Sequence, residues 1–233
     1  MTICVCGIPG IPIGKNNIKD PRLDQTHELV EAKKKVYAQV DVVGEEGSME
    51  ADSILATSDG LMDLLIKDIE MVETRLQRDP SDAERAALLK LQEELEAETP
   101  VSAAGLSDEE RAELSAHGFH TSRPVVVVGD DERDDPDAVL VRGFAGSGYI
   151  SYLTVGGSEN RAWVIRDGAT AAEAAGAIHT DLEKGFIRAE VIGFDDFLAA
   201  GGETEAKRAG HQRLEMKQYI VQDYDLMNIR ANK

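Results

Sequence analysis

A glycine-rich turn near the start of the chain is the first feature whose residue types could do chemistry. The apolar run Ile3–Cys6 leads into a Gly-Ile-Pro-Gly turn, a strand-to-turn pattern, and a Gly-Lys pair follows it. In a phosphate-binding loop of the form GxxxxGK[ST], backbone N–H groups surround the phosphate, the lysine reaches its outer oxygens, and the final hydroxyl holds Mg²⁺. The candidate nucleotide-binding residues of this loop are Gly7, Gly10, Gly14, Lys15 and Asn16.

This loop departs from the motif in ways that matter physically. Six residues separate Gly7 from Gly14, and Asn16 stands where Ser or Thr would coordinate Mg²⁺. Pro9 and Pro12 each remove a backbone N–H donor. No helix of normal length is expected between Lys15 and the following Asp-Pro, so a helix dipole aimed at phosphate is not expected either. The sequence therefore favours weak or lost nucleotide hydrolysis, although a bent loop would let Lys15 reach a phosphate.

A second candidate is the short pattern Asp41-x-x-Gly44 at the end of a β-rich run. In a nucleotide site, Asp41 would hold Mg²⁺ through water and Gly44 would sense the terminal phosphate. The alternative interpretation is structural, with Asp41 ending a strand and Gly44 making the turn. Both interpretations stay open at this stage.

The elements that must position these residues can be read from apolar periodicity. A β-branched run in Lys33–Val43 predicts a strand, and Pro124–Val128 is a near-continuous apolar run that predicts a fully buried strand. Apolar residues at helical spacing in Met62–Arg78 and Ala83–Glu98, with an Asp-Pro break between them, predict a helical hairpin. Parallel strands with an inserted helical hairpin are therefore expected in the first part of the chain.

Histidine, cysteine and the acidic loop offer little further chemistry. His117 and His120 could supply only a pair of metal ligands, so a metal site there is not expected. The acidic loop Gly129–Asp137 has oxygen ligands but lacks the spacing of a Ca²⁺ loop, and a solvated charge run is the better interpretation. Cys4 and Cys6 lie two apart on one strand, a poor geometry for a disulfide, so reduced and buried thiols are expected.

Composition bounds the class of protein. The chain of 233 residues carries a formal charge of −19, yet residues 145–233 hold 13 acidic and 10 basic side chains, so most of the negative charge lies in residues 1–144. Such a surface disfavours broad contact of the first part with phosphate backbones, and DNA is not expected as a partner. An acidic proteome would explain the charge equally well. No run of 18 apolar residues occurs, so membrane association is not expected, and the predicted location is cytoplasmic.

The last third of the chain carries the densest pattern. It reads as strand, helix, strand, short helix and a closing pair of strands over Arg161–Ala199 and Tyr219–Asn232. This segment resembles the C-terminal TGS domain of the Obg-like ATPases, the YchF family of P-loop proteins. The matching residues are Gly176, His179, Asp181, Lys184-Gly185-Phe186, Glu190-Val191, Asp195-Asp196-Phe197, Arg213-Leu214-Glu215 and Tyr219-Ile220-Val221.

The order of short sequence patterns in the first part of the chain is similar to their order in the same family, with large deletions between them. The pieces after the glycine-rich turn are Asp20-Pro21-Arg22-Leu23-Asp24, Lys33-Lys34-Lys35-Val36, Asp41-x-x-Gly44, Lys67–Glu73 and Ser122-Arg123-Pro124. At the family's base-specificity position, Asp130 replaces an asparagine. A carboxylate accepts hydrogen bonds but cannot donate one to a base nitrogen, so base recognition is expected to be altered.

The resemblance implies a fold and a function. The expected fold class is α/β: a reduced P-loop-type parallel sheet over residues 1–144 with a helical-hairpin insertion at about 62–118, followed by a TGS domain of β-grasp (α+β) fold over 145–233. The family binds ATP or GTP with Mg²⁺, here with Asp41 as the metal-facing carboxylate, and is ribosome-associated. Whether this chain is a hydrolase stays open.

The same resemblance points to contacts with the ribosome or RNA through the TGS domain. The candidate contact residues are His179, Lys184, Arg188 and Arg213. The structural alternative is that His179 and Asp181 cap a helix end and fix the turn beside Lys184. A nucleotide-independent TGS interaction module on a remnant scaffold is the alternative function.

Overall fold

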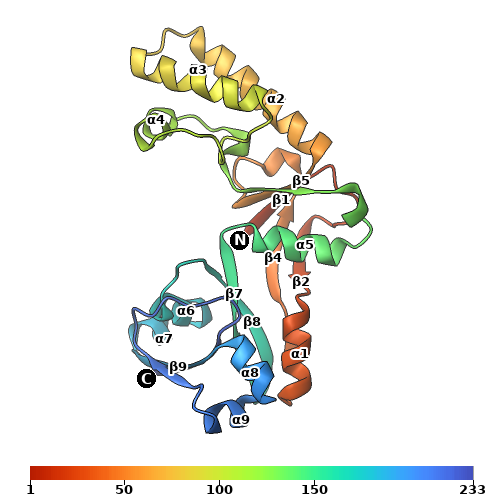
Figure 1. Cartoon of the computed structure of the whole chain (residues 1–233), viewed down its shortest axis with the longest axis vertical. Coiled ribbons are helices and arrows are strands. Elements are labelled where there is room, and N and C mark those ends of the chain that lie inside the picture. Colours follow the sequence, from red (N-terminus) through yellow and green to blue (C-terminus); the bar gives the residue numbers. More distant parts are fainter. Residues whose placement is uncertain (233) are drawn as a thin grey trace. The chain divides into compact units, whose positions relative to one another are not determined.

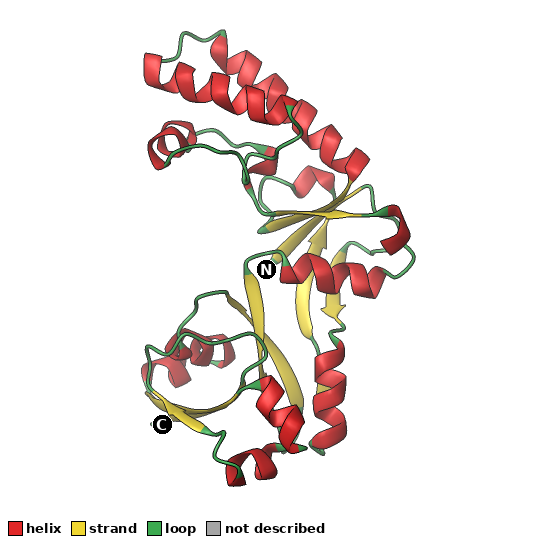
Figure 2. Cartoon of the chain, in the orientation of Figure 1, coloured by secondary structure: helices red, strands yellow, loops and turns green. Residues whose placement is uncertain are grey.

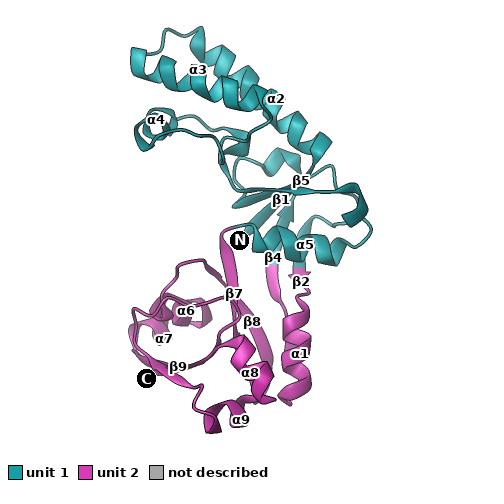
Figure 3. Cartoon of the chain, viewed as in Figure 1, with its two compact units in different colours: residues 1–16, 40–147 teal, residues 17–39, 148–233 magenta. Residues whose placement is uncertain are grey.

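The computed structural model describes residues 1–232, and these form two compact units. One unit comprises residues 1–16 and 40–147, and the other comprises residues 17–39 and 148–232 (Figure 3). We call them the sheet unit and the C-terminal unit. The domain division expected near residue 144 stays a prediction, and the compact units differ from it in grouping residues 17–39 with the C-terminal residues.

The sheet unit is built on a five-stranded sheet with the order β2-β4-β1-β5-β6 (Figure 1). Strand β1 pairs in parallel with both β4 and β5, and β5 pairs in parallel with β6. The predicted parallel sheet is therefore confirmed. The strands are β1 Thr2–Cys6, β2 Gly14–Ile18, β4 Ala38–Val43, β5 Ser53–Thr57 and β6 Val125–Val128.

Strand β6 corrects one expectation. Its run of four valines predicted a fully buried strand, but Val127 is 37% exposed and only Val128 is fully buried. The reason is its place in the sheet, because β6 lies at the edge and pairs with β5 alone. Helix α5 (Pro136–Ala145) follows it, after the short 3-10 turn η3 (Asp130–Glu132).

The centre of this sheet is apolar and tightly packed. Cys4 and Cys6 are buried against Ile54, Ala56 and Leu64. Both cysteines are free thiols with their Sγ atoms 3.4 Å apart, which confirms the expectation of reduced, buried thiols.

The helical insertion consists of α2 (Ser58–Leu76), α3 (Asp82–Glu96) and α4 (Asp108–Leu114), drawn in red in Figure 2. The first two form the predicted hairpin, with Leu65, Val72, Leu88 and Leu91 in a shared core. The buried carboxylate of Asp68 ties α2 to the 3-10 turn η2 (His120–Ser122). It accepts hydrogen bonds from the backbone N–H groups of His120 (2.6 Å) and Thr121 (2.9 Å) and from the Thr121 hydroxyl (2.6 Å).

The C-terminal unit is a six-stranded mixed sheet with the order β10-β9-β11-β7-β8-β3. Helix α6, between β8 and β9, packs on one face of it, as expected for the β-grasp prediction. The strands are β3 Lys35–Val36, β7 Tyr149–Thr154, β8 Asn160–Arg166, β9 Phe186–Ile192, β10 Arg213–Glu215 and β11 Leu226–Ala231. The helices are α1 Pro21–Leu29, α6 Ala171–Ile178, α7 Thr180–Lys184, α8 Phe194–Ala200 and α9 Glu203–Arg208.

Small side chains explain the close approach of α6 to its sheet. Ala171, Ala174 and Ala175 are fully buried, and the Tyr152 hydroxyl donates a hydrogen bond of 2.6 Å to the carbonyl of Ala174. Across residues 1–232, the structure contains no helix with the length and apolarity needed to cross a membrane.

Candidate functional site

The carboxyl edge of the parallel sheet is where a nucleotide site is expected, since ligands of open α/β sheets bind outside the carboxyl ends of the strands. Gly7 follows β1, Gly44 follows β4, and Gly129 and Asp130 follow β6. Thr57 ends β5 and begins α2. Three of the predicted site residues, Gly7, Gly44 and Asp130, therefore follow strands that end at this edge.

The turn after β1 packs against the first turn of α2. Gly7 has a φ of +72°, and a Cβ atom placed on it would lie 2.5 Å from the Thr57 hydroxyl oxygen. That hydroxyl also accepts a hydrogen bond of 3.0 Å from the N–H of Gly60, as the N-cap of α2. Glycine is required here because both the backbone conformation and the contact exclude a side chain.

The rest of the glycine-rich segment does not form a helix. Residues 8–13 connect β1 directly to β2, and Gly14, Lys15 and Asn16 lie on β2. The side-chain amide of Asn16 donates to the carbonyls of Pro12 (2.8 Å) and Gly14 (3.0 Å), so it closes a local loop. Lys15 is exposed on the strand. Gly10, with a φ of +85°, makes a turn in which an added Cβ would lie 3.2 Å from Pro136.

Asp41 lies inside β4 and not at its end, which differs from the expectation. The parallel register places Asp41 opposite Thr2, the first residue of β1, whereas Gly7 follows the last. At about 3.3 Å per strand residue, the five positions from Thr2 to Gly7 separate the two levels by roughly 16 Å along the strand. The backbone therefore does not bring Asp41 to the turn at Gly7.

The loops at the carboxyl edge are rich in carboxylates, and the basic groups near them are already paired. Lys67 forms an ion pair with Glu45, which raises the pKa of the lysine. The N–H of Gly129 and the Arg142 guanidinium lower the pKa of Glu132. The remaining predicted residue, Asp130, is highly exposed and lies 2.5 Å from the Arg133 guanidinium.

The histidines of the insertion serve the packing of the helices. The Nε2 atom of His117 lies 2.9 Å from a carboxylate oxygen of Glu84, and the Nδ1 atom of His120 lies 2.8 Å from the Ser48 hydroxyl. Within the part of the chain that the structure describes, no group of three or more His, Cys, Asp or Glu side chains could hold a metal ion.

The four candidate contact residues of the C-terminal unit divide into two kinds. His179 is the N-cap of α7, with its Nδ1 atom accepting a hydrogen bond of 3.1 Å from the N–H of Asp181. Arg213 donates to the Tyr219 hydroxyl at 2.9 Å and to Glu215 at 3.1 Å. Lys184, at the end of α7, and Arg188, on β9, both have exposed side chains.

The register of β9 and β10 separates two of these residues. Arg213 pairs with Val191, whose side chain lies in the core under α6. Arg188 and Val191 are three positions apart, and side chains alternate between the two faces of a strand. The two arginines therefore lie on opposite faces, and no single patch contains all four candidates.

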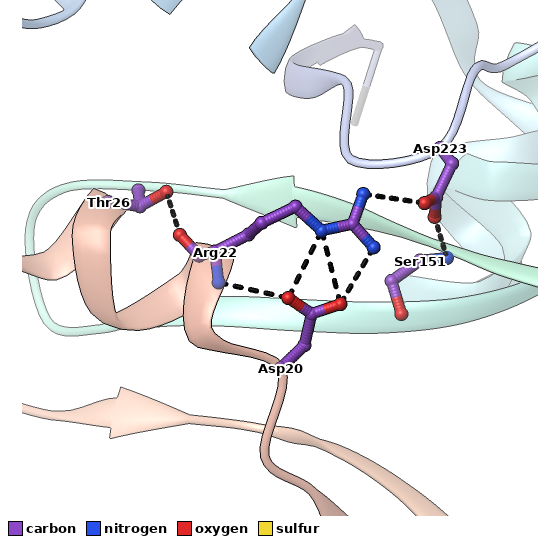
Figure 4. Close-up of polar contacts among 5 residues, drawn as sticks. All are labelled: Asp20, Arg22, Thr26, Ser151 and Asp223. Carbon is purple, nitrogen blue, oxygen red and sulfur yellow. Dashed lines mark hydrogen bonds and ion pairs between the residues drawn. The ribbon is translucent and has the colours of Figure 1, made fainter. Parts of the chain in front are cut away.

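Sequence reasoning missed a cluster around Arg22. The structure joins this residue to Asp20 and to Asp223, which is 201 positions away (Figure 4). The available signal was an Asp N-cap with Pro at the first helical position, which predicts a helix start at Asp20-Pro21. The partner in the C-terminal residues had no signal in the sequence.

Comparison with known proteins places these features in a family. The family model YchF-GTPase_C, described as "Protein of unknown function (DUF933)", matches residues 149–232. The "Ribosome-binding ATPase YchF" of Bacillus subtilis (strain 168) is 30% identical over 73% of this chain and 64% of the relative. The protein of the same name from Haemophilus influenzae is 54% identical over 40% of this chain and 26% of that relative. The chain thus spans about a quarter to two thirds of the length of these relatives.

A solved structure supports the fold along nearly the whole chain. The "Structure of the Schizosaccharomyces pombe YchF GTPase" aligns with a TM-score of 0.74 over 99% of this chain and 97% of that chain, at 18% identity. The sequence matches and the shared α/β fold agree with each other. The chain is a protein of the YchF family.

Proposed function

We propose that this chain is an Obg-like regulatory protein that associates with the ribosome through its C-terminal unit and in which ATP or GTP hydrolysis is weak or lost. The ribosomal part rests on the relatives named ribosome-binding ATPases, and its assignment to the C-terminal unit rests on the family model that matches residues 149–232. A cytoplasmic location follows from that proposal.

The observation that carries the second part is the geometry of the carboxyl edge. A hydrolytic site needs a loop around phosphate, a lysine on the outer oxygens and a carboxylate facing Mg²⁺ at one place. Here Lys15 and Asn16 belong to β2, and the register sets Asp41 roughly 16 Å from the level of Gly7. The same separation favours a nucleotide-independent interaction module as the second candidate function.

The C-terminal contact is proposed to use Lys184 and Arg188. Both side chains are exposed, whereas His179 caps a helix and Arg213 is engaged with Tyr219 and Glu215. Exposed cations contribute to RNA binding by neutralising phosphates and releasing counterions. These two residues are therefore the first to test.

The test is co-sedimentation of the full chain with ribosomes at two salt concentrations. We expect the Lys184→Ala/Arg188→Ala variant to bind about tenfold more weakly, with a shallower salt dependence. The matched control is Lys207→Ala/Arg208→Ala, which removes the same charge from α9. There Lys207 lies 2.5 Å from Glu203, and Arg208 lies 3.9 Å from Glu205. Equal losses in both variants, or no co-sedimentation of the wild-type chain, would contradict the proposed contact.

A further inference from the structure

Residues 17–39 leave the sheet unit and join the C-terminal unit. The segment begins on β2 and ends on β4, two strands that are coloured partly for each unit in Figure 3. Between them lie α1 and β3, at whose starts the two sequence patterns Asp20–Asp24 and Lys33–Val36 lie. The proposed nucleotide and ribosome chemistry assigns no task to either pattern.

Neither α1 nor β3 is stable by itself. Helix α1 has nine residues and β3 has two, and an isolated helix shorter than about 12 residues is marginal in water. The helix therefore depends on the surface that it covers. Leu23 and Thr26, on one face of α1, are fully buried.

Arg22 makes the most extensive polar contact of the segment. Its Nη1 atom donates to Asp223 at 2.7 Å, and its Nε and Nη2 atoms donate to Asp20 at 3.1 and 2.7 Å (Figure 4). The guanidinium carbon lies 3.7 Å from the centre of the Tyr224 ring. The other oxygen of Asp223 accepts a hydrogen bond of 3.0 Å from the N–H of Ser151 on β7.

Asp20 holds the Arg22 guanidinium in place independently of the contact with Asp223. Asp20 caps α1 by accepting from the N–H of Arg22, and it also accepts from the Arg22 side chain. Its carboxylate is almost fully buried. The planar fork of arginine is therefore fixed from one side by Asp20 and covered by an aromatic ring, which reduces the entropy lost on binding Asp223.

The loop that contacts Arg22 has an unusual backbone conformation at Tyr224. Tyr224 is 2% exposed and has a φ of +63°, a conformation that is costly for a residue with a side chain. The Arg22 guanidinium lies over its ring, and the ring of Phe194 contacts it in a T-shaped arrangement with a centroid distance of 5.6 Å.

A second group of contacts secures the far end of the segment. The fully buried side-chain amide of Asn160 donates to the carbonyl of Val30 at 2.8 Å and lies 3.0 Å from Nδ1 of His27. The backbone N–H of Asn160 donates to the carbonyl of Lys34 at 3.0 Å, and β3 pairs in parallel with β8. The segment thus supplies the outer strand of the C-terminal sheet.

We propose that residues 17–39 are an intramolecular docking element of the C-terminal unit and that Arg22 is its latch. The latch holds α1 and β3 on the C-terminal unit through Asp223 and Tyr224. The chain continues from both ends of this element into strands of the parallel sheet, so opening the latch frees α1 and β3 while both ends of the element stay in that sheet. The Asp20–Asp24 and Lys33–Val36 patterns then have a docking role that does not depend on nucleotide.

Hydrogen exchange of the full chain, followed by mass spectrometry without nucleotide or ribosomes, tests the latch. In Arg22→Ala and in Asp223→Asn, we expect the amides of residues 21–36 to exchange about tenfold faster than in the wild type. The asparagine retains an oxygen for the Ser151 N–H and loses the charge opposite Arg22. Peptides from α3 and β6 should exchange at the wild-type rate in both variants.

Arg188→Ala is the matched control, because it removes an exposed arginine from β9 of the same unit. It should leave residues 21–36 protected. If Arg22→Ala loosens the whole chain, Arg22→Lys decides, because it keeps the charge but loses the planar fork. Faster exchange confined to residues 21–36 and 220–226 would then support the latch. Wild-type protection of residues 21–36 in Asp223→Asn, or a uniform increase along the chain in Arg22→Lys, overturns it. Neither result depends on whether the ribosome is bound.

Discussion

The sheet unit and the C-terminal unit differ in what their family-like residues do in the structure. In the sheet unit, the strands and their parallel order remain, but the residues that would handle phosphate are spread over β2, β4 and the turn at Gly7. In the C-terminal unit, the matched positions have identifiable structural tasks: His179 caps α7, and Glu190 accepts from Arg230 at 3.0 Å across β9 and β11. The proposed loss of hydrolysis is therefore compatible with an intact sheet, because buried strands and not the loops at the carboxyl edge hold the sheet together.

The largest expected effect tests whether the sheet unit is a folded body and not a loose remnant. Asp68→Ala removes the acceptor of three hydrogen bonds in a fully buried position. We expect a loss of about 3–5 kcal/mol in the free energy of unfolding, because buried donors at His120 and Thr121 are left without a partner. Urea-induced unfolding measures it.

Asp63→Ala is the control for this prediction, since it removes an exposed carboxylate from the same helix. It should change the free energy of unfolding by less than about 0.5 kcal/mol. If the two variants unfold at the same urea concentration, the hydrogen bonds of Asp68 do not stabilise the helical insertion. The sheet unit would then be less firmly folded than the structure indicates.

The second effect compares one glycine from each unit. Gly7 and Gly148 have nearly equal φ angles, +72° and +76°, but an added Cβ at Gly7 meets the Thr57 hydroxyl at 2.5 Å, while Gly148 has nothing within 4 Å. We expect Gly148→Ala to lower the free energy of unfolding by about 1 kcal/mol from backbone strain, and Gly7→Ala by about 2–3 kcal/mol. Equal losses would mean that the turn after β1 is open, as a phosphate-binding turn would be.

The third effect is a pH dependence that belongs to the sheet unit. Arg75, and then His117, lower the pKa of Glu84 from 4.5 to about 2. A carboxyl group with a depressed pKa in the folded state stabilises the fold above its unfolded pKa and loses that contribution as the pH falls. Thermal unfolding of wild type and Glu84→Gln should therefore differ above pH 4.5 and converge between pH 4.5 and about 2. A difference that stays constant down to pH 2 would contradict the ion pair.

The smallest effect compares the helix caps of the two units. Thr57 caps α2 and Thr170 caps α6, each through its hydroxyl oxygen. Replacement of either by alanine should cost about 1 kcal/mol, measured as the shift in urea midpoint. A much larger loss at Thr57 would show that its contact with Gly7 also stabilises the carboxyl edge.

The sequence predicts the parts of this fold that rest on periodicity and local signals. The helical hairpin, the parallel sheet and the first helix of the pattern in Arg161–Ala199, observed as α6, are confirmed, because apolar spacing and short-range capping define them. The predicted full burial of β6 is wrong, because an apolar run does not reveal which strand lies at the edge of a sheet.

The arrangement of the candidate site could be predicted only in part. The turn at Gly7 was found from its glycines, but the position of Asp41 depends on the register between β1 and β4, which no local pattern reports. The bond from Arg22 to Asp223 joins residues 201 positions apart, and only the folded C-terminal unit brings them together.

We propose that the sheet unit retains its strands without a working phosphate site. Titration of fluorescent ATP and GTP analogues with Mg²⁺ into the full chain, repeated with Lys15→Ala, tests it most directly. We expect no saturable binding below millimolar nucleotide, or weak binding that is the same in both proteins, because Lys15 lies exposed on β2. Saturable binding that Lys15→Ala abolishes would contradict the account and would show that the loop from Gly7 to Asn16 still surrounds phosphate.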